Sequence, residues 1–192
     1  HCFGSAIPKD DNTYRTAFSN SVLEHIKVIQ PVLKEVFRVL EPGGVFYITI
    51  PTDQFEQYAL ISRILAKLGF NKLQLSFRRW YNNFWKHYHC YSPEEWETIL
   101  RQGGFSVIKK TEFAGKNTCT FNDILILSAI PSLFFKNIFS RWILFPKLRK
   151  VYMSALGKLF CLFLKDIEPG QKGGLIFFAL RKELIFPISV DS

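Results

Sequence analysis

The segment Thr16–Pro51 constrains the fold most, because it combines two apolar strands, an amphipathic helix and a sharp break. The helix is predicted to begin at Pro31, since proline lacks the N–H group that is unpaired in a first helical turn anyway. Pro42-Gly43-Gly44 is predicted to end it. The nearly continuous apolar run Val45–Ile50 predicts a parallel strand covered on both faces. A strand, a crossover helix and a second strand form a βαβ unit. The apolar side chains of the helix recur at helical spacing, at Val32, Leu33, Val36, Phe37 and Leu40.

Two motifs in this segment carry a family resemblance. SNSVLEHI (19–26) and LKEVFRVLEPGG (33–44), followed by a strand ending in proline, resemble the second half of the class I S-adenosylmethionine-dependent methyltransferases. The resemblance is closest to the type 11 methyltransferase family, where LEHI and RVLEPGG stand at the same separation. It implies an α/β, Rossmann-like sheet and S-adenosylmethionine as the cofactor, which lies beside the polar turn after the fourth strand.

The cofactor contacts are expected in two places. Ser19 and Asn20 end the first predicted strand, and ligands of open α/β sheets bind at the carboxyl ends of strands. With Ser21, they are expected to meet the methionyl part of the cofactor, largely through backbone groups. By resemblance, Ser5 and Ala6 occupy the segment that contacts the adenine ring, where Ser5 replaces the usual acidic residue. The alternatives are a turn that only ends a strand and an ordinary surface loop.

Glu24 and His25 are the candidate catalytic residues. Methyl transfer from a sulfonium mainly requires alignment of the nucleophile and removal of its proton. Histidine is the side chain that ordinarily exchanges a proton near neutral pH. The alternative, common in the family, is that the pair has a structural role and pins the turn to neighbouring backbone.

An aromatic and basic stretch, SFRRWYNNFWKHYHCYS (76–92), follows a helix that is predicted to stop at Gly69. Relatives carry an H-x-x-x-Y-S segment here, close to the substrate entrance, which makes His87, His89 and Tyr91 candidate substrate contacts. His87 and His89 share one side if the chain is extended. The alternatives are stacking of bases or sugars on the aromatic rings, and core packing with a cap over the site. A metal site is rejected, because no acid or cysteine stands nearby at a ligand spacing.

The chain has 192 residues, a formal net charge of +9 and a pI of about 9.4, which favours an anionic partner.

The segment from Ile124 to Lys165 has no acidic residue, and its longest uncharged run is too short to span a bilayer. This segment is predicted to lie on an anionic membrane surface, or to form a helical lid over the substrate pocket. Its composition favours a small-molecule, lipid-linked or glycan acceptor over nucleic acid. Seven basic residues interrupt it: Lys136, Arg141, Lys147, Arg149, Lys150, Lys158 and Lys165.

We expect a single partial domain over residues 1–192: sheet and helices in 1–120, the apolar basic insertion in 121–170, and a last, antiparallel strand in 171–185. A helix start at Ser92, a strand over Phe105–Phe113 and a strand over Leu175–Leu180 complete it. The chain begins without the glycine-rich turn and the ribose-binding acid of the family. It is therefore expected to be a fragment that binds S-adenosylmethionine weakly or not at all. Four scattered cysteines and no visible signal peptide predict reduced thiols in the cytoplasm, with the membrane contact peripheral.

Two rival functions remain. The first is a non-catalytic binding or scaffold protein that keeps the fold, which Ser5, Tyr14 and Arg15 favour because they depart from the family pattern. The second is a nicotinamide-dependent Rossmann enzyme, which fits poorly because no Tyr-x-x-x-Lys pair is present.

Overall fold

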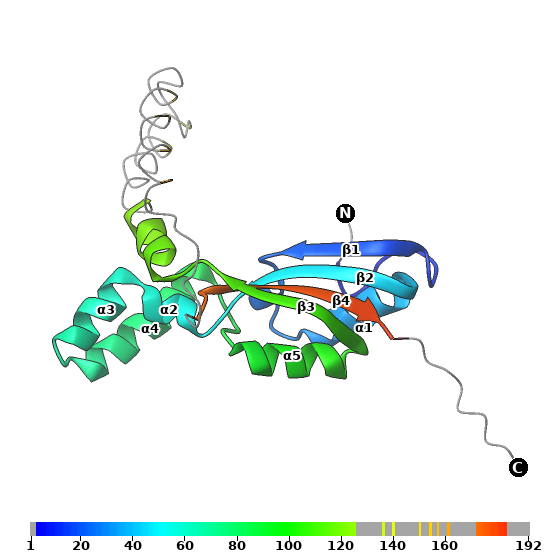
Figure 1. Cartoon of the computed structure of the whole chain (residues 1–192), viewed down its shortest axis with the longest axis horizontal. Helices are drawn as coiled ribbons and strands as arrows, with labels where there is room; N and C mark the ends of the chain where they lie inside the picture. The colour runs from blue at the N-terminus through cyan, green and yellow to red at the C-terminus, as the bar shows by residue number, and fades with distance from the viewer. Residues whose placement is uncertain are drawn as a thin grey trace, which may run out of the picture.

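The computed structural model describes residues 3–125 and 172–183, with six single positions between them. The predicted insertion therefore lies almost entirely outside the described residues. The helices and strands follow one another along the chain as β1 (Tyr14–Asn20), the short 3-10 helix η1 (Leu23–His25), α1 (Gln30–Val39), β2 (Leu40–Pro51), α2 (Gln54–Tyr58), α3 (Leu60–Lys67), α4 (Asn71–Trp85), α5 (Pro93–Gln102), β3 (Phe105–Phe113), an unlabelled helix over 116–125 and β4 (Leu175–Lys182) (Figure 1).

The four strands form one mixed sheet in the order β1-β2-β4-β3. β1 lies parallel to β2, with Ser19 opposite Ile48. β4, the last strand in the chain, inserts between β2 and β3 and runs antiparallel to both. Phe178 at its centre stands opposite Ile48 on β2 and Lys110 on β3. The predicted α/β fold and its antiparallel last strand are confirmed.

The break at Pro42-Gly43-Gly44 lies inside β2 instead of at the end of the helix. α1 has already ended at Val39, and Leu40 is extended with ψ 139°. The register shifts here, since Tyr14 pairs with Leu40 whereas Thr16 pairs with Val45. Gly43 adopts φ 77°, a left-handed conformation that favours glycine. The break therefore acts as a bulge that realigns β2 with β1.

The core lies on one face of this sheet. Phe46, Ile48 and Ile50 alternate inward along β2 and join one buried cluster with Leu33 of α1 and Trp96 of α5. Tyr47 points to the opposite face, where it stacks on Phe177 with 6.1 Å between ring centroids, and it is 36% exposed. The expectation that this strand is covered on both faces is therefore wrong for the described part of the chain.

Helix α5 begins at the Ser92 capping box, as its sequence predicts, and it is fixed to the carboxyl end of β2. Ser92 accepts a hydrogen bond from the backbone N–H of Glu95, and the Glu95 carboxylate accepts one from the N–H of Ser92. Trp96, fully buried, donates its indole N–H to the carbonyl oxygen of Pro51 at 3.0 Å. This bond holds the helix where the site is formed.

Helices α3 and α4 form a hairpin at one end of the sheet (Figure 1). Gly69 joins them with φ 77°, as the predicted helix stop requires. Ser62 is buried at their contact and accepts hydrogen bonds from Gln74 and Arg78. The expectation of aromatic core packing in α4 holds for Tyr81, but Trp80 and Phe84 are about half exposed. No helix among the described residues has the length and apolar character needed to cross a bilayer.

The inserted strand should dominate the stability. We expect Phe178→Ala to lower the free energy of unfolding by about 3–5 kcal/mol, because it removes a fully buried aromatic side chain from the core. Urea denaturation measures this change. The control is Phe18→Ala on β1, where the side chain is 69% exposed and the expected change is within about 0.5 kcal/mol. Equal losses would mean that β4 is not the centre of the core.

Candidate functional site

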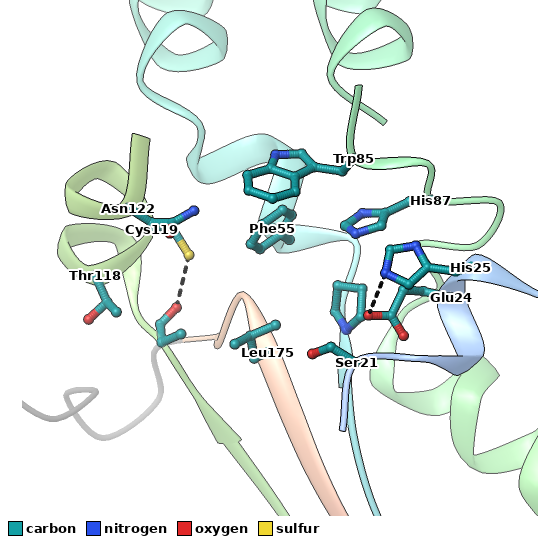
Figure 2. A pocket seen from close by; sticks show the side chains of 12 residues that line it. Ser21, Glu24, His25, Phe55, Trp85, His87, Thr118, Cys119, Asn122 and Leu175 are labelled. Atoms are coloured by element: carbon teal, nitrogen blue, oxygen red, sulfur yellow. Dashed lines mark hydrogen bonds and ion pairs between the residues drawn. The ribbon is translucent and has the colours of Figure 1, made fainter. Parts of the chain in front are cut away.

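A pocket of about 310 Å³ opens at the carboxyl ends of β1 and β2 (Figure 2). Several segments that are distant in sequence meet there: the turn after β1, the start of α2, the end of α4, the helix over 116–125 and the start of β4. The side chains around it are Ser21, Glu24, His25, Pro51, Phe55, Trp85, His87, Ala114, Thr118, Cys119, Asn122 and Leu175. This is the edge at which a parallel sheet usually binds its ligands.

The turn after β1 is fixed by β2. The Ser21 N–H donates to the carbonyl oxygen of Thr49 at 2.9 Å, and the Thr49 hydroxyl donates to the side-chain oxygen of Asn20. Ser21 adopts φ 50° and lines the pocket, whereas Ser19 and Asn20 precede it on β1 and do not line it. Of the three predicted methionyl contacts, the structure thus brings Ser21 to the pocket.

Glu24 is a buried acid at the pocket wall. Its side chain is 1% exposed, and burial raises the pKa of its carboxyl group. Oε1 lies 3.8 Å from Nε2 of His25, and Oε2 has no hydrogen-bond partner among the described residues. A buried carboxylate oxygen without a partner is costly, so this group favours a proton, a cation or a ligand donor beside it.

The two histidines of the pocket come from distant segments and lie together. The rings of His25 and His87 are 5.1 Å apart between centroids (Figure 2). His25 Nδ1 lies 3.0 Å from the carbonyl oxygen of Lys86, and the N–H of Tyr88 donates to the carbonyl oxygen of Glu24. Burial, and then the neighbouring His25, lower the pKa of His87 to about 4. The Glu24-His25 pair thus does join the turn to neighbouring backbone, while both side chains also face the pocket.

His89 and Tyr91 lie away from this pocket. His89 Nε2 lies 3.0 Å from the carbonyl oxygen of Ile26, and its ring stacks on Tyr91, which packs against Trp96. The expectation that His87 and His89 share one side assumes an extended chain, and this condition is not met. The chain bends at Tyr88, between the two histidines. His87 alone of the three predicted substrate contacts lines the pocket.

The rejection of a metal site assumes that no acid stands near the histidines, whereas the structure places one beside them. Glu24, His25 and His87 each offer one ligand atom, and these atoms lie within 4.8 Å of one another. The acid is remote from the aromatic stretch in sequence, but the contact between η1 and the end of α4 brings it to the histidines.

The far wall of the pocket depends on the start of β4. Thr52 donates its hydroxyl to the carbonyl oxygen of Gly173 at 2.5 Å and its N–H to that of Gly174 at 3.0 Å. A Cβ atom at Gly174 would lie 2.5 Å from Sγ of Cys119, so glycine permits this approach. Burial raises the pKa of the Cys119 thiol to about 12, which keeps it neutral. No sequence signal marks Cys119, Asn122 or Leu175 as pocket residues, because tertiary contacts alone bring them here.

Ser5 and Ala6, the predicted adenine contacts, lie elsewhere. Ser5 lines a separate surface hollow beside α1, and Ala6 closes a turn with Phe3. This segment is fastened to α1 through Ile7, whose N–H donates to Glu35 at 2.8 Å and whose carbonyl oxygen accepts from Arg38 at 3.0 Å. The structure does not bring Ser5 and Ala6 into one cavity with Ser21, and their cofactor role stays a prediction.

Glu35 makes this attachment sensitive to acid. Its hydrogen bonds from Arg38 and from Ile7 lower the pKa of the Glu35 carboxyl to about 2. The Glu35 carboxylate of the folded protein therefore binds its proton at a lower pH than that of the unfolded chain. The contribution of Glu35 to the free energy of unfolding is lost as the pH falls from about 4.5 to about 2. We expect the urea midpoint of the Glu35→Gln variant to fall less than that of the wild type across this window. Above pH 5 the two midpoints should differ by a constant amount. An equal fall of the two midpoints with pH would show that the attachment contributes nothing.

Comparison with known proteins places the chain in a family. A family model described as a methyltransferase domain matches residues 3–110, more than half of the 192 residues, and the chain belongs to this family. YrhH of Bacillus subtilis (strain 168), which is named as a methyltransferase, is 32% identical over 75 residues. That match covers 39% of this chain and 42% of YrhH, so the chain spans less than half the length of this relative.

Solved structures share the fold at low identity. The [4+2]-cyclase SpnF has a TM-score of 0.53 and 14% identity over 95% of this chain and 54% of its own. A Galdieria sulphuraria protein named as a sarcosine dimethylglycine methyltransferase has a TM-score of 0.51 and 17% identity over 95% of this chain and 57% of its own. At these identities the likeness shows the Rossmann-like class I methyltransferase fold, and the chemistry must be argued from the site.

Proposed function

We propose that the natural protein transfers a methyl group from S-adenosylmethionine to an acceptor bound in the pocket of Figure 2, as a relative of the type 11 methyltransferases. The observation that carries this proposal is the turn Asn20-Ser21, which the backbone of Thr49 holds at the carboxyl edge of β1, next to Glu24 and His25. Family membership supplies the reaction, and the turn supplies the place where cofactor and acceptor would meet.

The proposed site residues form two groups, one at the end of β1 and in the turn after it, and one at the pocket wall. Ser19, Asn20 and Ser21 face the cofactor, with polar groups at the end of an exposed strand. Glu24 and His25 face the acceptor from the pocket wall, where they would orient its nucleophile and remove its proton. His87 lies beside His25 and would limit the room for the acceptor at this wall.

This division predicts different effects of two substitutions. Asn20→Ala should weaken S-adenosylmethionine binding about tenfold, because it removes the side-chain oxygen that accepts the hydrogen bond from Thr49 and so loosens the turn. His25→Ala should change cofactor affinity less and lower the methylation rate more. Calorimetry with S-adenosylmethionine on the natural protein measures the affinities. Equal losses of affinity would remove this assignment of roles.

The walls of the pocket favour an amphiphilic acceptor. Phe55, Trp85 and Leu175 supply large apolar surfaces, while Glu24 and His25 supply the polar groups at one side. A lipid-linked or glycan acceptor, or another small molecule with both kinds of surface, fits this lining better than nucleic acid.

The α3–α4 hairpin supports an anionic membrane surface as the place of action. From Gln57 to Pro93 the chain has no acidic residue, and the hairpin exposes large apolar side chains at its tip, among them Leu68, Phe70 and Leu73. Trp80 and Phe84 continue this surface along α4, stacked at 5.6 Å. Cations beside apolar side chains suit the interface of an anionic bilayer. The cations of this stretch are Arg63, Lys67, Lys72, Arg78, Arg79 and Lys86.

Vesicle sedimentation tests this contact. Changing Lys67, Lys72 and Arg79 together to Gln should weaken binding to phosphatidylserine-containing vesicles at least tenfold, since each cation near such a surface contributes about 1 kcal/mol. High salt should remove only part of the wild-type binding, because the apolar side chains are insensitive to it.

The matched control removes three exposed cations from other elements, by Lys34→Gln, Lys109→Gln and Lys116→Gln, and should bind almost as the wild type does. A third variant changes Lys147, Arg149 and Lys150 to Gln and tests the insertion in the same way. Wild-type protein that ignores anionic vesicles at low salt would contradict a membrane contact by either segment.

A binding or scaffold role is the second candidate. Ser5, Tyr14 and Arg15 depart from the family pattern, and Ser5 lines a hollow separate from the pocket. A natural protein that binds vesicles but neither S-adenosylmethionine nor S-adenosylhomocysteine would favour this role. The free thiols Cys90, Cys119 and Cys161 support a reducing compartment, the cytoplasm, in either case.

A further inference from the structure

We propose that Glu24, His25 and His87 bind one divalent transition-metal ion, with an open coordination position that faces the pocket. The proposal rests on the arrangement of these three side chains and does not depend on methyl transfer. Their ligand atoms lie within 4.8 Å of one another, and they come from two segments that backbone hydrogen bonds hold together (Figure 2).

The separations are close to those of a bound site. Ligand atoms at about 2.0–2.2 Å from a tetrahedral zinc ion lie about 3.4 Å from each other. His25 Nε2 and Glu24 Oε1 are already 3.8 Å apart. The remaining separations are at most 4.8 Å, so side-chain movements on the order of an ångström would complete the coordination.

The two ring nitrogens of His25 have different neighbours, and their arrangement favours a bound cation. Its Nδ1 lies 3.0 Å from the carbonyl oxygen of Lys86, and a carbonyl oxygen only accepts, so Nδ1 carries the hydrogen. In the neutral imidazole, Nε2 then presents a lone pair toward the Glu24 carboxylate, which also only accepts when ionised. In these forms two acceptors face each other, and either a proton or a metal cation between them resolves the conflict. Metal-binding histidines are held through the other ring nitrogen in this way.

The remaining groups are consistent with a cation. Glu24 Oε2 is buried and has no partner in the part of the chain that the structure describes. The side chain of Glu24 is 1% exposed, and its ion-pair partner among those residues is His25 at 3.8 Å, which carries a charge only when it is protonated. A buried carboxylate needs such compensation. His87 contributes a second imidazole from the segment after α4, beside Phe55.

The donor set selects the class of ion. Two imidazoles and one carboxylate suit Zn²⁺, Fe²⁺, Co²⁺ and related ions, and zinc enzymes use this set with water in the fourth position. Mg²⁺ and Ca²⁺ prefer oxygen ligands. The open position would face the pocket and would accept an oxygen of a bound molecule there.

Cobalt is the probe of choice because it absorbs visible light when it enters such a site. After treatment with a chelator and its removal, Co²⁺ should bind the natural protein with a ratio of one to one and develop a visible absorption band. Zn²⁺ should displace it, whereas a hundredfold excess of Mg²⁺ should not. Neither S-adenosylmethionine nor an acceptor is present, so failure here is separate from failure of the proposed reaction.

Single substitutions identify the ligands. Glu24→Gln, His25→Ala and His87→Ala should each weaken Co²⁺ binding by at least tenfold to a hundredfold. His89→Ala is the matched control, since this histidine packs against Tyr91 outside the pocket, and it should bind as the wild type does. Circular dichroism verifies that each variant folds.

Three results would overturn the proposal. They are no Co²⁺ binding by the wild type at about millimolar concentration and neutral pH, unchanged affinity in folded His87→Ala, and an equal loss in His89→Ala. If a variant does not fold, paramagnetic NMR of the wild type with Co²⁺ still decides the matter. The largest shifts should fall on His25 and His87, and a maximum elsewhere would exclude the site.

Discussion

The fold depends on the antiparallel pairing of β4 with β2 and β3. β4 comes from the end of the chain, yet it fills the centre of the sheet and contributes fully buried side chains such as Ile176 and Phe178. Its first residues also complete the pocket, because Thr52 at the end of β2 binds the backbone of Gly173 and Gly174. Non-local pairings of this kind form late and at an entropic cost. The core and the candidate site are therefore completed together, when the last strand pairs.

The candidate site is a group of polar side chains in a mostly apolar pocket. Burial raises the pKa of Glu24 and lowers that of His87, so both groups favour their neutral forms unless a ligand supplies charge. Structural ion pairs on the surface, such as Arg38 with Glu35 and Asp11, contrast with this, since their partners satisfy one another. Perturbed groups that converge in a pocket are a recognised sign of function, which is why the proposals centre on this edge of the sheet.

The sequence predicted those features that local chemistry determines. The Ser92 cap, the stop at Gly69 and the strands Phe105–Phe113 and Leu175–Leu180 follow from short-range signals, and the structure confirms them. Burial was less predictable, since the same aromatic periodicity buries Tyr81 and exposes Trp80. The proximity of Glu24 to His87 could not be read from spacing, because it arises from backbone contacts between η1 and the end of α4. The separation of His87 from His89 likewise depends on a bend at Tyr88 between them.

Lys86 connects the α3–α4 hairpin to the pocket through a hydrogen bond. It is the residue at which α4 ends, and its carbonyl oxygen receives the Nδ1 hydrogen of His25. A small rotation of α4 about its axis would move this oxygen and release the hydrogen to the other ring nitrogen. The tautomer of His25 then reports the position of a helix whose outer surface is apolar and basic. The hydrogen bond between His25 and Lys86 therefore ties the lone pair that faces Glu24 to the residue at which α4 ends.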